Sequence, residues 1–190
     1  MTRLILASSS PRRRLLLSVA GFEFSVDPPQ VDERLVNGEE PDRMVVRLAR
    51  EKALAIATGA GTVVLGADTT VVLDGRILGK PESETDASAM LLSLAGRTHL
   101  VITGWAVGRG GYIIEDGFDT SLVSMRSVTQ GEADAYAESG EPLDKAGGYA
   151  LQGDGARFVS GVAGSRSNVI GLPLRPIVAA LGRAGIEAIR

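Results

Sequence analysis

Two long segments rich in β-forming residues follow each other in the middle of the chain, Thr98–Val107 and Tyr112–Val128, joined by the glycine-rich run GRGG. Elsewhere, segments with strand and helix patterns alternate. Consecutive strands inside an alternating pattern favour a mixed sheet flanked by helices over a purely parallel, doubly wound sheet. The sequence therefore predicts an α/β protein with a mixed sheet.

The first twenty residues predict a strand, a serine loop and a helix. The apolar run Arg3–Ala7 is typical of a buried strand, and three serines follow it. Ser10 suits the N-cap of a helix, Pro11 suits its first position, and Gly21 suits its C-terminal stop. In this geometry backbone N–H groups at the helix start converge on an anion.

The rest of the chain supplies further elements with clear boundaries. We expect strands at Phe22–Val26, Thr62–Leu65 and Arg76–Leu78, with Val71–Leu73 extended, and helices at Pro41–Thr58, Ser83–Ala95, Thr129–Glu138 and from Pro173 onward. The sequences SETD and TQGE resemble capping boxes at two of these helix starts. Residues 147–174 are dense in glycine, with interspersed β-type residues.

Composition excludes several classes of function. The chain has 190 residues, a formal net charge of -3, one histidine and no cysteine. Disulfides, thiolate catalysis, cysteine-based metal sites and sites built from several imidazoles are therefore excluded. The charge argues against a nucleic-acid partner, and the lack of a long apolar run argues against a membrane partner. We expect one domain, residues 1–190, in the cytoplasm.

The basic segment after the first strand is a candidate phosphate site. Ser8 would offer a hydroxyl, and Arg12 and Arg13 lie one helical turn further on, where guanidinium groups can bind phosphate oxygens bidentately. The local pattern also fits a capped surface helix with solvated arginines, which is a common arrangement.

Two carboxylates are candidates for metal binding or proton transfer. Asp68 directly follows an apolar strand, so its side chain would lie just beyond a strand end, and Glu33 lies in a proline-stiffened loop. Mg²⁺ is satisfied by a few protein oxygens together with water and phosphate. An Asx turn at Asp68 and a solvated charge at Glu33 are the structural alternatives.

Two lysines and one glutamine complete the set of candidates. Lys52 falls within a predicted helix, Lys80 lies in a Gly-Lys-Pro turn, and either ammonium could neutralise phosphate charge. Gln152, in the glycine-rich region, offers an amide that can read a base edge. The alternatives are a surface i,i+4 ion pair for Lys52, an ordinary turn residue at Lys80 and a solvated Gln152. His99 is interpreted as a structural polar residue.

Taken together, these segments resemble the Maf family of nucleoside triphosphate pyrophosphatases, also described as septum-formation inhibitors. The resemblance runs nearly from end to end. It rests on LASSSPRRRLLL, VDE, REKA, GADTTVVLDGRILGKP, GRTHLVITG, EPLDKAGGYALQG and NVIGLPL, in this order.

The resemblance implies an α/β fold of the inosine-triphosphatase-like type, an elongated mixed sheet flanked by helices with a cleft between two lobes. It implies hydrolysis of a nucleoside triphosphate to the monophosphate and pyrophosphate, with a divalent cation, Mg²⁺ or Mn²⁺. The alternative is a nucleotide-binding regulator of cell division that hydrolyses little. Exposed strand edges of a mixed sheet would allow a homodimer.

The resemblance also assigns roles to single residues. The proton acceptor falls on Asp68, with Glu33 as the second acidic residue of the metal site. The phosphate-binding residues are Ser8, Arg12, Arg13, Lys52 and Lys80. Arg12, Thr69 and Gln152 match the branch that acts on dTTP and UTP. Arg166 departs from the family, which usually has an aromatic residue there.

Overall fold

The computed structural model describes residues 2–189, and the chain divides into two compact units. Unit 1 comprises the chain up to Asp68, Thr103–Asp119 and the chain from Gly171 onward. Unit 2 comprises Thr69–Ile102 and Thr120–Ile170. Both units are therefore built from segments that are distant in the sequence.

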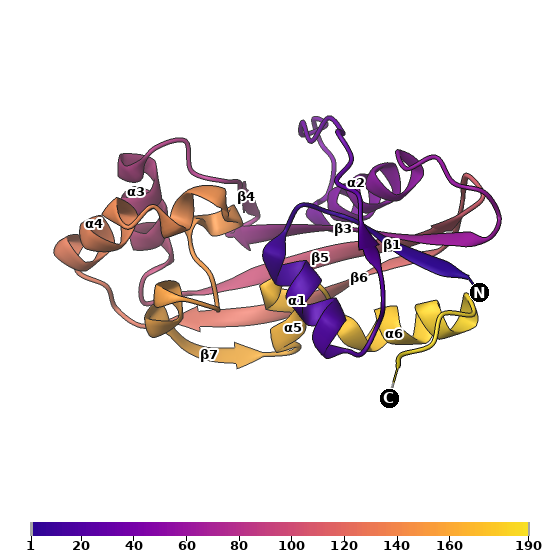
Figure 1. Ribbon diagram of the computed structural model, residues 1–190. Coiled ribbons are helices and arrows are strands. Elements are labelled where there is room, and N and C mark those ends of the chain that lie inside the picture. Colours follow the sequence, from indigo (N-terminus) through magenta and orange to yellow (C-terminus); the bar gives the residue numbers. More distant parts are fainter. Residues whose placement is uncertain (1, 190) are drawn as a thin grey trace. The chain divides into compact units, whose positions relative to one another are not determined.

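Helices and strands alternate through most of the chain (Figure 1). The strands are β1 (Arg3–Ala7), β2 (Ser25–Val26), β3 (Thr62–Leu73), β4 (Arg76–Leu78), β5 (Thr98–Arg109), β6 (Tyr112–Met125) and β7 (Val159–Ala163). The helices are α1 (Pro11–Val19), α2 (Pro41–Leu54), α3 (Glu84–Leu94), α4 (Gln130–Glu138), α5 (Arg166–Ile170) and α6 (Leu174–Arg183). Short 3₁₀ turns occupy Glu141–Asp144, Ala146–Gly148 and Asp154–Phe158.

Among residues 2–189 the strands form one seven-stranded sheet in the order β2-β1-β3-β5-β6-β7, with β4 paired to β3. β1 pairs parallel to both β2 and β3. The β3–β4 and β6–β7 pairs are antiparallel. The predicted mixed α/β sheet flanked by helices is thus confirmed.

Side chains on the strands of unit 1 alternate between two cores. Leu6 and Leu65 pack with Leu17 of α1 and Ile177 of α6 on one face. Their neighbours on the other face form a smaller core that includes these residues: Ala7, Val64, Ala49, Ala53 and Ala106. Because successive residues of a strand point to opposite faces, α2 covers one face and α1 and α6 cover the other.

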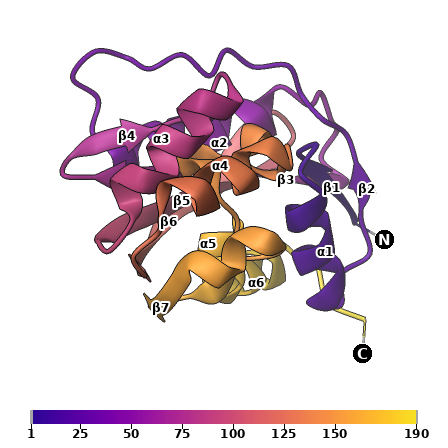
Figure 2. The ribbon, with the colours of Figure 1, turned by 90° about the vertical axis from the view of Figure 1, so that its left-hand side faces the viewer.

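Unit 2 has one core of its own. Leu91 of α3 and Tyr136 of α4 pack against Val71 of β3 and Val101 of β5. The Tyr136 and Phe158 rings meet edge to face with centroids 5.2 Å apart. Figure 2 shows α3 and α4 side by side over the strands of this unit.

Most predicted boundaries are confirmed where a cap marks them. Ser10 accepts a hydrogen bond from the Arg13 N–H at the start of α1. Thr129 and Glu132 form a complete capping box at α4. At α3 only half of the predicted capping box forms. The Ser83 side chain accepts from the Asp86 N–H, but the Asp86 carboxylate accepts from the N–H of Glu82 and not from that of the cap residue Ser83.

Several element predictions need correction. The strand predicted at Tyr112–Val128 ends at Met125, and the one predicted at Thr98–Val107 continues to Arg109. The first helix after the proline loop ends at Leu54 and not at Thr58, and the second strand is limited to Ser25–Val26. β3 does not stop before Asp68 but runs unbroken from Thr62 to Leu73. Its pairing partner changes: Ala7 of β1 pairs with Gly66, and β4 begins pairing at Val71. Asp68 therefore lies within a strand, beyond the end of its neighbour β1.

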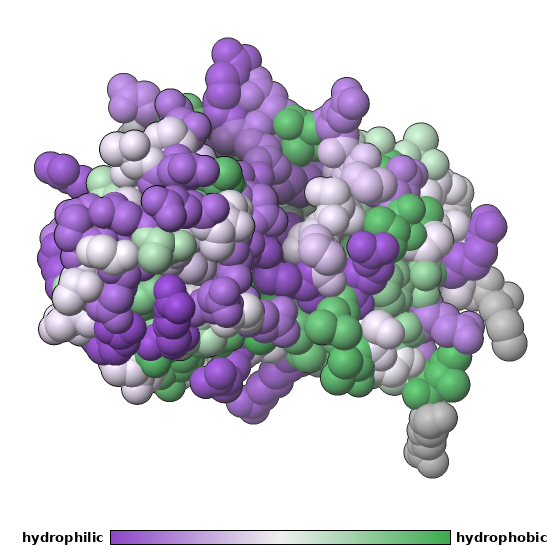
Figure 3. All heavy atoms as spheres, turned by 60° about the vertical axis from the view of Figure 1, so that its left-hand side comes forward, coloured by the Kyte–Doolittle hydropathy of each residue, from purple (hydrophilic) through white to green (hydrophobic). Residues whose placement is uncertain are grey.

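The surface shown in Figure 3 is mainly hydrophilic, with hydrophobic side chains in small separate groups. No helix among the described residues is long and apolar enough to cross a membrane.

Candidate active site

The serine loop after β1 is held by hydrogen bonds within unit 1. Ser8 is buried, and its Oγ accepts from the Ser10 N–H at 3.2 Å and from Nη1 of Arg13 at 3.4 Å. The loop is therefore folded back on the first turn of α1, as expected for an anion-binding helix start.

Arg13 links this loop to two other segments. Its Nε donates to the Gly171 carbonyl at 2.8 Å, and Nη1 donates to the Ala67 carbonyl at 2.9 Å. Burial lowers the pKa of Arg13, whereas the nearby Asp68 carboxylate raises it. The charges of Arg12 and Glu33 act on the same guanidinium. Four of the predicted charged residues therefore lie close enough to interact.

Lys52 lies between two carboxylates. Its Nζ is 2.6 Å from Oδ1 of Asp68 and 2.6 Å from Oε1 of Glu33. The side chains of Lys52 and Asp68 are only 10% and 13% exposed, whereas that of Glu33 is 47% exposed. The surface i,i+4 ion pair considered for Lys52 is thus wrong, because its partners lie in a loop and on a strand.

Two glycines set the position of α2 above the sheet. A Cβ at Gly66 would lie 2.2 Å from the Ala49 carbonyl oxygen, and one at Gly104 would lie 2.3 Å from that of Val45. The helix backbone therefore rests directly on β3 and β5, where only glycine fits. Position 66 is two residues before Asp68 and on the same face of the strand, so this contact brings Lys52 over Asp68.

Sequence reasoning missed the role of these glycines, although a signal was present. Gly66 interrupts an apolar strand, and such glycines often mark a close backbone approach. Lys52 lies seven residues after the buried Val45, on the apolar face of α2. A lysine on the apolar face of a helix indicates a buried partner.

Glu33 and Asp68 form a donor set suited to a divalent cation. Each has an oxygen 2.6 Å from the same nitrogen, so both can reach a single positive charge. Within residues 2–189, no group of three or more His, Cys, Asp or Glu side chains is placed to hold a metal ion. Mg²⁺ or Mn²⁺ bound here would therefore complete its coordination with water and substrate phosphate, as Mg²⁺ commonly does.

The remaining predicted residues, Thr69, Lys80 and Gln152, belong to unit 2. Lys80 is exposed, and its turn is tied to the glycine-rich segment by the hydrogen bond from the Gly147 N–H to the Gly79 carbonyl at 2.9 Å. Gln152 is half-buried. Their arrangement around a nucleotide stays a prediction.

Glu141 is a further residue that sequence reasoning missed. Its carboxylate accepts from the backbone N–H groups of Asp154 and Gly155 and from the Tyr136 hydroxyl, at 2.9, 3.1 and 2.9 Å. These bonds shape the loop that carries Gln152. No local pattern in the sequence points to them, because the partners are 5 to 14 residues away.

The other residues singled out from the sequence lie outside the charged cluster of unit 1. His99 is buried, and its Nε2 lies 2.6 Å from the Tyr149 hydroxyl, in keeping with a structural role. Arg166 is exposed at the start of α5. The nearby Asn168 is buried and donates to the Val101 carbonyl and to Oγ of Ser121, both at 3.0 Å.

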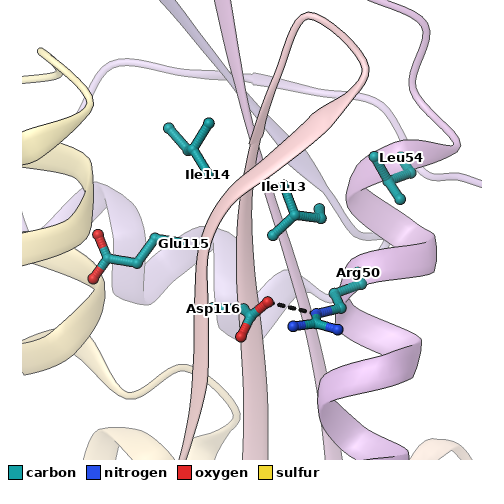
Figure 4. Close-up of a pocket in the computed structure, with 6 residues that line it drawn as sticks. All are labelled: Arg50, Leu54, Ile113, Ile114, Glu115 and Asp116. Carbon is teal, nitrogen blue, oxygen red and sulfur yellow. Dashed lines mark hydrogen bonds and ion pairs between the residues drawn. The ribbon is translucent and has the colours of Figure 1, made fainter.

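A separate hollow of about 510 Å³ lies along β6 in unit 1. It is lined by Arg50, Leu54, Ile113, Ile114, Glu115 and Asp116. In Figure 4 Arg50 reaches from α2 to Asp116, with Nε and Oδ2 2.5 Å apart, and Glu115 points toward the opposite helix. None of the predicted site residues lines this hollow.

Known proteins resemble this chain over nearly its full length. Residues 3–184 match the family model described as Maf-like protein. The dTTP/UTP pyrophosphatase of Myxococcus xanthus is 50% identical over 186 residues, covering 97% of this chain and 94% of its own. That of Anaeromyxobacter dehalogenans is 49% identical over 186 residues, covering 96% and 94%. That of Moorella thermoacetica is 44% identical over 191 residues, covering 98% and 97%.

A more distant similarity exists to a solved structure, the nucleoside-triphosphatase (dITP/XTP pyrophosphatase) of Mycobacterium abscessus. It is 14% identical, with a TM-score of 0.43 and coverage of 96% of this chain and 95% of the other. That likeness is too low to support a conclusion. The family model and the relatives at 44–50% identity show the family by themselves: the chain is a member of the Maf family.

Proposed function

We propose that the protein hydrolyses nucleoside triphosphates to the monophosphate and pyrophosphate, with dTTP and UTP as its substrates. The names of the three relatives support the reaction and the substrates. The observation that carries the proposal is the contact of the buried Lys52 with Asp68 and Glu33, close to the Arg13 guanidinium. Buried charges in such a group are typical of a site that handles charged substrates.

The basic residues would neutralise the substrate. A triphosphate carries about four negative charges at neutral pH, which repel an incoming nucleophile. Arg12 and Lys52 in unit 1, with Lys80 in unit 2, would offset that charge as it moves onto the leaving pyrophosphate. Ser8 and Arg13 shape the loop at the start of α1 that would receive a phosphate.

Asp68 would act as the proton acceptor. A water oxygen attacks the α-phosphorus, the bond to the bridging oxygen breaks, and pyrophosphate leaves. The carboxylate of Asp68 takes the proton of that water. Glu33 and Asp68 would also hold a divalent cation, which when bound supplies charge neutralisation and polarises phosphoryl oxygens.

Base selection would depend on Arg12, Thr69 and Gln152. The Gln152 amide can offer a donor and an acceptor to the edge of uracil or thymine. Gln152→Glu removes the donor and is expected to lower the ratio of UTP to GTP hydrolysis. An unchanged ratio would show that Gln152 does not select the base.

A pyrophosphate-release screen tests the function. All nucleoside triphosphates are assayed with Mg²⁺, with Mn²⁺ and with excess chelator. We expect release from dTTP and UTP that depends on the added cation. Nucleotide binding without release from any triphosphate would instead support the alternative, a nucleotide-binding regulator of division.

The family match spans segments of both units, which supports treating residues 1–190 as one functional domain. A homodimer and a cytoplasmic location stay predictions, as does the absence of a nucleic-acid partner. Size-exclusion chromatography with light scattering would test the homodimer.

A further inference from the structure

We propose that Lys52 competes with the metal cation for Glu33 and Asp68, so that nucleotide binding and metal binding strengthen each other. The proposal rests on the function proposed above. It adds an order of binding: the cation binds well only after a phosphate oxygen of the triphosphate has paired with the Lys52 ammonium.

The competition follows from where the ammonium lies. Nζ of Lys52 is 2.6 Å from an oxygen of each carboxylate, which is the place that a cation shared by both would need. The lysine side chain is 10% exposed, so water gives this positive charge little screening. A divalent ion and the ammonium would repel each other strongly there, and only one of them can occupy the position.

The side chain and not the helix must move to admit the ion. Gly66 and Gly104 allow the backbone of α2 to rest on two strands, and the buried Ala49 and Ala53 pack beside them. This contact fixes the Cα of Lys52. A lysine has four flexible methylene groups, so its ammonium can leave the carboxylates while the helix stays in place.

A triphosphate gives the displaced ammonium a new partner. Lys52 paired with a phosphate oxygen no longer opposes the cation at Glu33 and Asp68. Coupling between two binding events is reciprocal, so the cation must raise the affinity for nucleotide by the same factor as the nucleotide raises the affinity for the cation.

A second cation on α2 provides the matched control. Arg47 also bridges two carboxylates, with Nη2 2.7 Å from Glu39 and Nη1 3.2 Å from Glu51. It lies outside the proposed metal site. Removing it therefore tests the general effect of deleting a positive charge from this helix.

The experiment measures Mn²⁺ binding without nucleotide, by titration with electron paramagnetic resonance detection of free Mn²⁺. We expect weak binding by the native protein and binding at least about tenfold tighter by Lys52→Gln, since one tenfold step corresponds to a single modest ionic interaction. Arg47→Gln should bind as the native protein does. Equal or weaker binding by Lys52→Gln, or an equal gain in Arg47→Gln, would overturn the proposal.

A second arm adds α,β-methylene UTP, which cannot be hydrolysed at the α-phosphorus. After subtraction of the Mn²⁺ that the nucleotide binds without protein, it should tighten Mn²⁺ binding at least about tenfold in the native protein and much less in Lys52→Gln, because that variant has no ammonium for the nucleotide to displace. Absence of any nucleotide effect in the native protein would contradict the coupling.

Lys52→Arg keeps the proposal testable if Lys52→Gln does not fold, as judged by circular dichroism. The guanidinium can bind both carboxylates through its fork, so Mn²⁺ should bind no more tightly than to the native protein. Tighter binding would refute the competition. The readout is metal binding, so its failure leaves pyrophosphate release untouched, and the screen above tests that release separately.

Discussion

Among residues 2–189, unit 1 buries a charged side chain, whereas the buried polar side chains of unit 2 are neutral. Unit 1 buries the charged Lys52 against Asp68, whereas unit 2 buries the neutral His99 against Tyr149 and Asn168 against Ser121. Among the buried polar residues of the described chain, Lys52 is the one that carries a full charge at neutral pH. A buried charge is costly unless it is paired, whereas a neutral pair joins core segments at little cost. We therefore expect the buried charge of unit 1 to serve the proposed reaction and the buried neutral pairs of unit 2 to stabilise the fold.

Asp68→Asn should have the largest effect, and it falls on activity. The amide cannot accept the proton of the attacking water, so turnover should drop about 10²–10⁴-fold, the usual contribution of a general base. Nucleotide affinity measured without added cation should be retained, whereas the gain in affinity that the cation brings should shrink, because Asp68 is also a proposed metal ligand. Steady-state rates and equilibrium binding of α,β-methylene UTP measure the two effects. Native-like turnover would mean that the buried charge of unit 1 does not serve catalysis.

Gly66→Ala should have the next largest effect. It tests whether the packing of α2 on β3 positions the charges of Lys52 and Asp68. The new Cβ would lie 2.2 Å from the Ala49 carbonyl oxygen, so α2 must shift. We expect a loss of about 3 kcal/mol in the free energy of unfolding, together with a fall in activity. Chemical denaturation measures the loss. Gly59→Ala is the control, because nothing lies within 4 Å of a Cβ there. Equal stability of both variants would exclude the proposed close contact.

The pH dependence of stability tests the neutral pair of unit 2. Burial lowers the pKa of His99 to about 4. Its pKa in the unfolded chain is about 6.5, so at intermediate pH the unfolded chain binds a proton that the folded one does not. The free energy of unfolding should therefore fall by about 2 kcal/mol between pH 7 and pH 5.

Urea unfolding at pH 7 and pH 5 measures this slope. The chain contains one histidine, so no other imidazole contributes. His99→Gln should remove most of the slope, although it should also lower stability at pH 7. A slope that persists in the variant would assign the effect to other groups.

Arg47→Met should have the smallest effect, because its ion pairs lie nearer the surface. A loss of at most about 1 kcal/mol at pH 7 is expected. The hydrogen bond from Arg47 lowers the pKa of Glu39, so this stability is present above the ordinary carboxylate pKa. It disappears as the pH falls below about 4 and Glu39 takes up a proton. Unfolding of the native and variant proteins at pH 7 and pH 3 should give converging free energies. A difference that is larger at pH 3 would contradict the assignment.

The sequence predicted elements with local boundary signals better than it predicted contacts. The first strand was correct at both ends, and the caps at Ser10 and Thr129 were found because each cap lies within a few residues of its partner. The predicted division of β3 into two segments is wrong, because the polar residues that follow Gly66 resemble the end of a strand. A change of pairing partner in the middle of a strand leaves no local mark.

The same difference between local signals and long-range contacts applies to the candidate site. Ser8, Arg13, Glu33, Lys52 and Asp68 were all proposed from the sequence, yet each then had an equally simple structural alternative. Only the fold shows Lys52 facing two carboxylates, 16 residues from Asp68 along the chain. Arg13 illustrates the reverse case, because its bonds to the Ala67 and Gly171 carbonyls give it a structural task that its motif did not indicate.

The two glycines beneath α2 also limit how this protein could be redesigned. A helix pressed against bare backbone at Gly66 and Gly104 has no clearance left to approach the sheet, so a shorter cationic side chain at position 52 could not be compensated by moving the helix inward. The length of the side chain at position 52 then sets how far its ammonium group extends from the helix. Analogues of lysine that are one methylene shorter or longer would therefore measure how activity depends on the position of that charge.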